Sequence, residues 1–220
     1  MSAPPLRAVI VPVTPLQQNC TLLWCTKTMR GAFVDPGGDL PKLRAVAAEH
    51  GVTVEKILLT HGHIDHCGEA GVLSQELGVP IEGPQEADRF WIERLEADGR
   101  KYGIRGVPFE PDRWLNEGDQ VHVGELAFAV HHCPGHTPGH VIFHQRDSKL
   151  ALVGDVLFRG SVGRTDFPRS NPQALIDSVV AKLWPLGDDT AFIPGHGPAS
   201  NFGYERRTNP FVGDAALRRS

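Results

Sequence analysis

The segment THGHIDH at residues 60–66 places three histidines and one aspartate within six consecutive positions. These side chains bind metal ions or transfer protons, and the spacing His-x-His-x-Asp-His seldom arises by chance. His61 and His63 are two residues apart, so in an extended segment both imidazoles point to one side, and Asp65 continues that alternation. His66 breaks the alternation and reaches a second point if a helix begins there. The segment therefore predicts a metal site, and the fold has to bring further ligands to it.

Three other segments each place a metal-binding residue beside glycine or proline at the end of an expected strand. They contain His136 in PGHTPGH, Asp155 in VGD and His196 in PGHGP. Loops at strand ends often carry functional residues because the rigid sheet fixes their position. One catalytic zinc takes about three protein ligands plus water. The complete set therefore suits two divalent metal ions that share one carboxylate, Asp155; its members are His61, His63, Asp65, His66, His136, Asp155 and His196.

The chemistry of this set suits zinc first, with iron or manganese as alternatives, because it contains five imidazoles, two carboxylates and no thiolate. Cys67 and Cys133 lie near the histidine-rich segments, and we interpret both as small buried hydrophobic residues. Thr60 and Asp35 are expected to hold ligand imidazoles through the second ring nitrogen. Other histidines nearby are interpreted as strand residues or as supports behind the ligands: His131, His132 and His140.

Strand-like and helix-like segments alternate in both halves of the chain. Short β-branched or aromatic runs predict strands at 7–13, 19–26, 31–37, 54–60, 120–123, 126–133, 140–145, 149–155 and 190–196. Helices are expected at 39–51, with Asp39 as N-cap, at 68–78 and at 172–184. This order predicts two mixed sheets packed face to face with helices outside. Residues 84–118 begin like an amphipathic helix and then become irregular, and the C-terminal tail is rich in turn residues. Three aromatic residues of 84–118 either line a substrate mouth or pack a small core: Trp91, Phe109 and Trp114.

Composition excludes several classes of function. The net charge is -4, so no basic excess indicates a nucleic-acid partner. The apolar run near the N-terminus has four residues and ends at Pro12, which is too short for a membrane span or a signal-peptide core. The four cysteines form no CxxC pair, which suits reduced thiols in the cytoplasm. We expect a cytoplasmic protein with one domain over residues 1–220 and no membrane partner. The sequence does not indicate an oligomeric state.

The order of these motifs resembles the metallo-β-lactamase superfamily. THGHIDH, PGHTPGH, the GD pair at 154–155 and PGHGP follow one another as in that superfamily, and the resemblance spans nearly the whole chain. It implies an αββα sandwich with a dinuclear site along one edge. One metal would be held by His61, His63 and His136. The other would be held by Asp65, His66 and His196, with Asp155 bridging the two.

Two further stretches resemble short bacterial members of the glyoxalase II-like branch, GSVGRTDFP at 160–168 and PGHGPASNFGYERRTNPF at 194–211. This resemblance implies hydrolysis of a small-molecule thioester, with hydroxyacylglutathione such as S-lactoylglutathione as the reference substrate. A hydroxide bridging the metals would attack the carbonyl, and Asp65 would be catalytic by orienting it. The helical C-terminal domain of full-length glyoxalase II is expected to be missing. Aspartate at position 155 argues against a β-lactamase with a cysteine ligand.

The resemblance leaves the thiol carrier and one rival activity open. Arg164 resembles a residue that binds the glycyl carboxylate of glutathione, but it is equally suited to an ion pair with Asp166 or Asp155. Asp166 stands where the family has tyrosine, and its charge would repel that carboxylate. The alternative activity is a persulfide dioxygenase of the same fold, which uses a single iron held by the residues matching His61, His136 and Asp155. A nuclease is disfavoured by the charge, and a non-catalytic metal protein by the complete ligand set.

Overall fold

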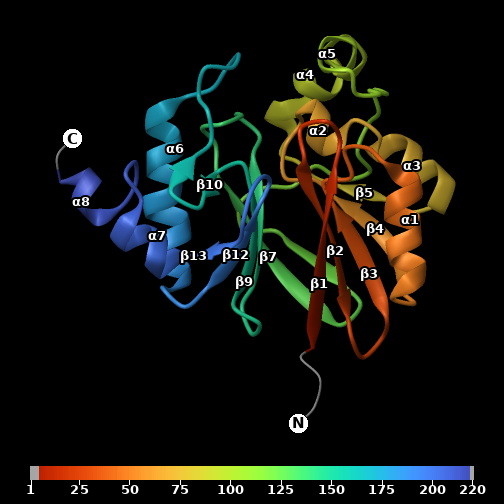
Figure 1. Ribbon diagram of the computed structural model, residues 1–220, viewed down its shortest axis with the longest axis horizontal. Helices are drawn as coiled ribbons and strands as arrows, with labels where there is room; N and C mark the ends of the chain where they lie inside the picture. The colour runs from red at the N-terminus through yellow and green to blue at the C-terminus, as the bar shows by residue number, and fades with distance from the viewer. Residues whose placement is uncertain (1–4, 219–220) are drawn as a thin grey trace.

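Two mixed β-sheets form the centre of the computed structural model, which describes residues 5–218 (Figure 1). The first sheet has the order β1-β2-β3-β4-β5, with antiparallel pairs up to β3 and parallel pairs beyond. Its strands are β1 (Leu6–Val13), β2 (Gln18–Cys25), β3 (Arg30–Val34), β4 (Thr53–Leu58) and β5 (Ile81–Glu82). The sequence thus predicted its four long strands correctly to within two or three residues at each end.

The second sheet has the order β13-β12-β9-β8-β7-β6, in which β9 and β12 are parallel and the other neighbours antiparallel. Its strands are β6 (Gln120–Val123), β7 (Leu126–His132), β8 (Val141–Gln145), β9 (Leu150–Gly154), β12 (Ala191–Pro194) and β13 (Ser200–Asn201). A small separate hairpin is formed by β10 (Leu157–Phe158) and β11 (Ser161–Val162). The hairpin leads the chain from β9 across the edge where the predicted metal residues lie.

Both sheets are buried on both faces, as alternate residues of the central strands show. Leu22 faces a core shared with helices, whereas Leu23 faces a core that contains side chains of both sheets. Phe143 of β8 belongs to that shared core, and its neighbour Ile142 to a third core on the opposite face. Successive residues of a strand point to opposite faces, so three cores separate four layers. The expected αββα sandwich is confirmed.

Helices form the outer layers (Figure 1). The first sheet is covered by α1 (Leu40–Glu49) and α3 (Ala70–Leu77), and the second by α6 (Pro172–Ser178) and α7 (Phe202–Thr208). The helix begun by α6 continues through a π-helical segment (Val179–Leu183) and a 3-10 turn (Trp184–Leu186), which confirms the prediction for 172–184. Asp39 precedes α1, but its carboxylate accepts a hydrogen bond from the Thr14 amide and does not cap the helix.

Two segments differ from the sequence expectation. Residues 84–118 contain a 3-10 turn (Glu86–Asp88) and two short helices, α4 (Arg89–Ile92) and α5 (Leu95–Tyr102), where one amphipathic helix was expected to begin. The tail contains α7 and α8 (Asp214–Leu217), although turns were expected there. Helix α7 forms because the Asn201 side chain caps the Tyr204 amide at 2.8 Å and Phe202 is fully buried in the third core. Among residues 5–218, no helix is both long and apolar enough to cross a membrane.

Candidate metal centre

All seven predicted metal residues lie at one edge of the sandwich, where the strands of both sheets end. His61 and His63 follow β4, and the short helix α2 (Ile64–Cys67) carries Asp65 and His66. The other three come from the second sheet, after the strands β7, β9 and β12; they are His136, Asp155 and His196. The helical start at Ile64 directs His66 Nε2 toward a second point, beside Asp65 and Asp155, as the broken alternation predicted.

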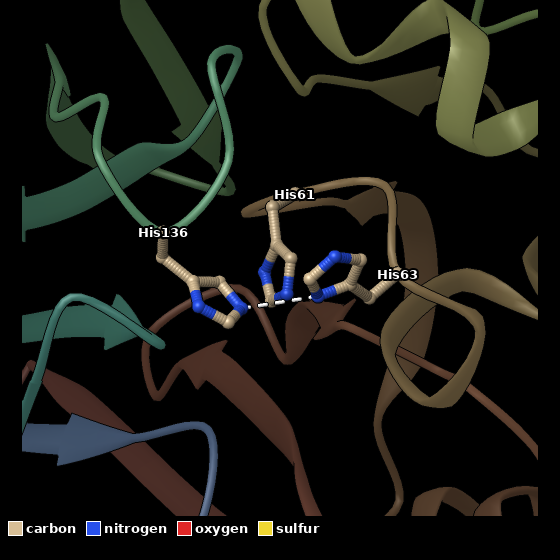
Figure 2. Close-up of side chains that lie close together, drawn as sticks. All are labelled: His61, His63 and His136. Carbon is tan, nitrogen blue, oxygen red and sulfur yellow. Dashed lines mark hydrogen bonds between the residues drawn. The ribbon is translucent and has the colours of Figure 1, made fainter. Parts of the chain in front are cut away.

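The seven residues fall into two groups. In the first, one nitrogen from each of His61, His63 and His136 lies within 4.8 Å of the others, and the three rings point to a common centre (Figure 2). His136 Nε2 lies 3.0 Å from His63 Nδ1. In the second group, one nitrogen or carboxylate oxygen from each of Asp65, His66 and His196 likewise lies within 4.8 Å of the others. These are the two sets that the family resemblance implied.

Asp155 lies between the two groups. Its Oδ2 is 3.5 Å from His136 Nε2 in the first group and 3.8 Å from His196 Nε2 in the second. Its Oδ1 is 3.4 Å from His66 Nε2. The loop that carries His196 can approach Asp155 closely because residue 195 is glycine. A Cβ on Gly195 would lie 2.1 Å from Asp155 Oδ1. A single carboxylate is thus placed within reach of both groups.

Hydrogen bonds fix which ring nitrogen faces the centre. His136 Nδ1 donates to the Arg164 carbonyl at 2.7 Å, and His66 Nδ1 to Asp35 Oδ2 at 2.8 Å. The opposite nitrogens of His61 and His66, both Nε2, are buried and have no hydrogen-bond partner among residues 5–218. Asp155 Oδ1 is likewise buried without a partner. Buried polar atoms without partners are rare, and metal ligation satisfies all three, so the site fits a bound metal.

Asp35 connects the two groups from behind. Its Oδ2 accepts from the hydroxyl of Thr60 at 2.6 Å as well as from His66 Nδ1. Because that hydroxyl donates to Asp35, its oxygen accepts from His61 Nδ1, 3.0 Å away. One carboxylate therefore orients His61 in the first group and His66 in the second. The expected contacts of Thr60 and Asp35 with imidazoles of the predicted ligand set are present.

Burial and neighbouring charges set the protonation states. Burial lowers the pKa of His61 and His63 well below the usual range, and lowers that of His136, so these rings are neutral at neutral pH. Burial would raise the pKa of Asp155, but the nearby histidines, His66 foremost, more than offset it and hold it well below its ordinary value. Neutral imidazoles and ionised carboxylates are the forms that bind metal ions. The electrostatics therefore favour metal binding in the first group.

Asp88 is a supporting residue that the sequence did not indicate. It is fully buried, and its Oδ2 accepts from the Gly62 amide at 2.9 Å and from the Thr137 hydroxyl at 2.7 Å. Its Oδ1 accepts from the Gly139 amide at 2.6 Å. Burial raises its pKa to about 6, although these hydrogen bonds oppose the rise. Asp88 thus joins the loop of His61 and His63 to the loop of His136.

The other singled-out residues support the site or lie outside it. His140 is fully buried, stacks on His61 with ring centroids 4.7 Å apart, and its Nε2 accepts from the Asp155 amide at 3.0 Å. It therefore supports the site from behind, as expected. Cys67 and Cys133 are buried free thiols, and burial raises the pKa of both. Asn19 was not anticipated: its side chain donates to the carbonyls of two residues that flank the His196 loop, Pro194 and Gly197, at 3.0 and 2.8 Å.

A cavity of about 520 Å³ opens above the two groups. Its apolar walls are formed by Leu16, Trp91, Phe158, Phe167 and Pro168. Of the three aromatic residues considered for a substrate mouth, Trp91 lines this cavity, whereas Phe109 and Trp114 pack against the core of the first sheet. Arg164 also lines it, with its guanidinium in two hydrogen bonds to Asp166 at 3.0 and 2.7 Å. Of the two ion pairs considered for Arg164, the structure contains the one with Asp166.

Comparison with known proteins assigns the family. Residues 13–196 match the family described as the metallo-beta-lactamase superfamily. The chain belongs to this superfamily. It is 44% identical over 205 residues to the hydroxyacylglutathione hydrolase GloC of Haemophilus influenzae, covering 92% of this chain and 96% of that protein.

Two solved structures are also similar to this member of the superfamily. The BLEG-1 B3 metallo-beta-lactamase has a TM-score of 0.86 at 31% identity, covering 94% of this chain and 99% of that one. TTHA1623 in a di-iron-bound form has a TM-score of 0.83 at 38% identity, covering 92% and 99%. With its cluster of histidines and aspartates, the protein is a metal-dependent hydrolase with a site for divalent metal ions.

Proposed function

We propose that this protein holds two divalent metal ions, zinc in the first instance, in the two groups of the candidate metal centre. His61, His63 and His136 bind one ion, and Asp65, His66 and His196 bind the other, with Asp155 shared between them. The observation that carries this proposal is the position of Asp155, within 3.8 Å of imidazole nitrogens from both groups. When bound, two metals activate water as a nucleophile at neutral pH and polarise a carbonyl group.

The reaction that this site supports best is hydrolysis of a thioester, with a hydroxyacylglutathione such as S-lactoylglutathione as substrate. This reaction is supported by the similarity to the hydroxyacylglutathione hydrolase of Haemophilus influenzae, which extends over 92% of the chain. Asp65 lines the cavity and forms an ion pair of 3.1 Å with His196. The neighbouring histidines lower the pKa of Asp65 although burial opposes this, so it stays ionised and accepts a hydrogen bond from the attacking water.

The cavity supports the same assignment. A volume of about 520 Å³ suits a small-molecule ligand, since such sites measure about 300–1,000 Å³. Its walls are mainly apolar, as is usual for small-molecule sites. Arg164 lines the mouth, where the thiol part of the substrate leaves the site. Its charge is compensated by Asp166, so Arg164 contributes shape and a hydrogen-bond donor more than net attraction.

Turnover of S-D-lactoylglutathione by zinc-loaded protein tests this function. We expect saturable loss of thioester absorbance that disappears when a chelator removes the metal and returns when zinc is added. A β-lactam is assayed in parallel because of the similarity to BLEG-1, and glutathione persulfide with iron-loaded protein and O₂ tests the dioxygenase alternative. Metal-loaded protein that consumes either of these and leaves the thioester intact would contradict the proposal.

Replacing Asp35 by asparagine should weaken metal binding in both groups. Asparagine cannot accept all the hydrogen bonds that Asp35 receives from Thr60 and His66, and loss of such support costs about 10- to 100-fold in metal affinity. Thr60→Val removes only the link to His61 and should weaken the first group alone. Competition with a chromophoric chelator measures both affinities. Equal effects of the two variants on both metals would show that Asp35 does not connect the groups.

A further inference from the structure

One face of the α4–α5 region forms part of the cavity mouth. Four residues line the cavity there: Arg94, Asp98, Lys101 and Tyr102. The first three are spaced four and three apart, which places them on one side of the helix. Arg164 lies on the hairpin side of the same mouth. The mouth therefore carries three cationic side chains, although the metal centre below it carries the carboxylates of Asp65 and Asp155.

The three cations differ in how far their charge is compensated. The guanidinium of Arg164 is paired with Asp166 through two hydrogen bonds. Arg94 lies 3.4 Å from Asp98 and stacks on the Trp91 ring at 5.2 Å. Lys101 forms no ion pair with a carboxylate among residues 5–218, and its ammonium lies 4.9 Å from the centroid of the Tyr102 ring. Lys101 is thus the cavity-lining cation whose charge is left to attract an anion.

The depth of the cavity determines which part of a substrate meets this charge. The reacting carbonyl has to lie at the metal centre, beside Asp65 and Asp155. The thiol carrier then extends along the apolar walls toward α5. A cavity of about 520 Å³ lies within the range of about 300–1,000 Å³ that is usual for small-molecule sites, and a carrier the size of a short peptide suits it.

We propose that Lys101 binds a carboxylate of a peptide-sized, anionic thiol carrier and thereby determines substrate specificity at this site. The proposal rests on the thioesterase function proposed above. Lys101 does not touch the reacting atoms, so it affects binding of the carrier and leaves the chemical step unchanged. Arg164, the residue that the sequence suggested for this role, is already neutralised by Asp166.

The test compares Lys101→Ala and Lys101→Glu with wild-type protein on three thioesters that share one acyl group. The carriers are glutathione, with carboxylates; N-acetylcysteamine, without charge; and coenzyme A, with phosphates. For the glutathione thioester we expect KM to rise about threefold to tenfold in Lys101→Ala and further in Lys101→Glu, with kcat unchanged. For the uncharged thioester we expect no change.

Arg100→Ala is the matched control, because Arg100 precedes Lys101, pairs with Glu96 at 2.7 Å and does not line the cavity. It should leave all three KM values unchanged. Equal effects of Lys101→Ala on charged and uncharged carriers, or an effect confined to the coenzyme A thioester, would overturn the proposal. So would an Arg100→Ala effect as large as that of Lys101→Ala, which would indicate a general effect of surface charge.

Binding of S-methylglutathione, which has no thioester to cleave, separates this proposal from the proposed function. Calorimetry should show about threefold to tenfold weaker binding to Lys101→Ala than to metal-loaded wild-type protein. If the difference appears while no thioester is hydrolysed, the carboxylate site stands and the thioesterase function fails. If thioesters are hydrolysed and both proteins bind S-methylglutathione equally, the role of Lys101 fails and the thioesterase function stands.

Discussion

Asp155→Ala is expected to lower kcat/KM for the thioester by about a thousandfold or more. The two bound metals supply several kcal/mol of stabilisation to the transition state, and each factor of ten in rate corresponds to about 1.4 kcal/mol. Asp155 is the carboxylate within reach of imidazoles from both groups. Without it, each group keeps three residues but loses the carboxylate that lies within reach of both, so at least one metal should be lost.

Metal content and activity are measured together on the purified variant. Mass spectrometry of bound metal should find fewer than two ions per chain, and circular dichroism should show the same secondary structure as wild type. Asp147→Ala is the control, because Asp147 lies exposed in the turn before β9, at the opposite end of that strand from Asp155. An Asp155→Ala protein with two bound metals and normal turnover would refute the shared-carboxylate arrangement.

The position of the predicted metal residues could be foreseen because it depends on local pattern. The strand β4 ends at Leu58, two residues before Thr60, and the helical start at Ile64 divides His63 from His66. Both features follow from the alternation of side chains and from the glycine-containing turn in the segment itself. The same holds for the four layers, because the strands are short apolar runs separated by turn residues.

Contacts between distant segments were not predictable in the same way. Asp88 lies where an amphipathic helix was expected to begin, a pattern that gives no sign of its role, and its three partners are 26, 49 and 51 residues away in sequence. The tail helix α7 depends on the burial of Phe202 against Phe192, which requires the second sheet to be in place. A short-range clue existed for α7, since Asn201 is a favourable N-cap residue. For Asp88 the sequence offers no comparable clue.

Asp88→Ala is expected to lower the thermal stability of the protein strongly. It leaves the Gly62 and Gly139 amides and the Thr137 hydroxyl without their acceptor. Each buried donor without a partner costs about 1–3 kcal/mol, and 1 kcal/mol shifts Tm by about 2–4 °C in a domain of this size. The midpoint of thermal unfolding of metal-loaded protein should therefore fall by about 10 °C or more.

The same substitution should weaken the first metal group more than the second. Gly62 lies between His61 and His63, and Thr137 follows His136, so every loop that Asp88 joins carries a member of the first group. Asp112→Ala is the matched control: Asp112 accepts one backbone hydrogen bond, from Ile81 at 2.8 Å, and supports no loop of the site. It should lower Tm by a few degrees and leave both metal affinities unchanged. If Asp88→Ala loses stability but keeps both metals with unchanged affinity, Asp88 stabilises the fold without positioning the histidines.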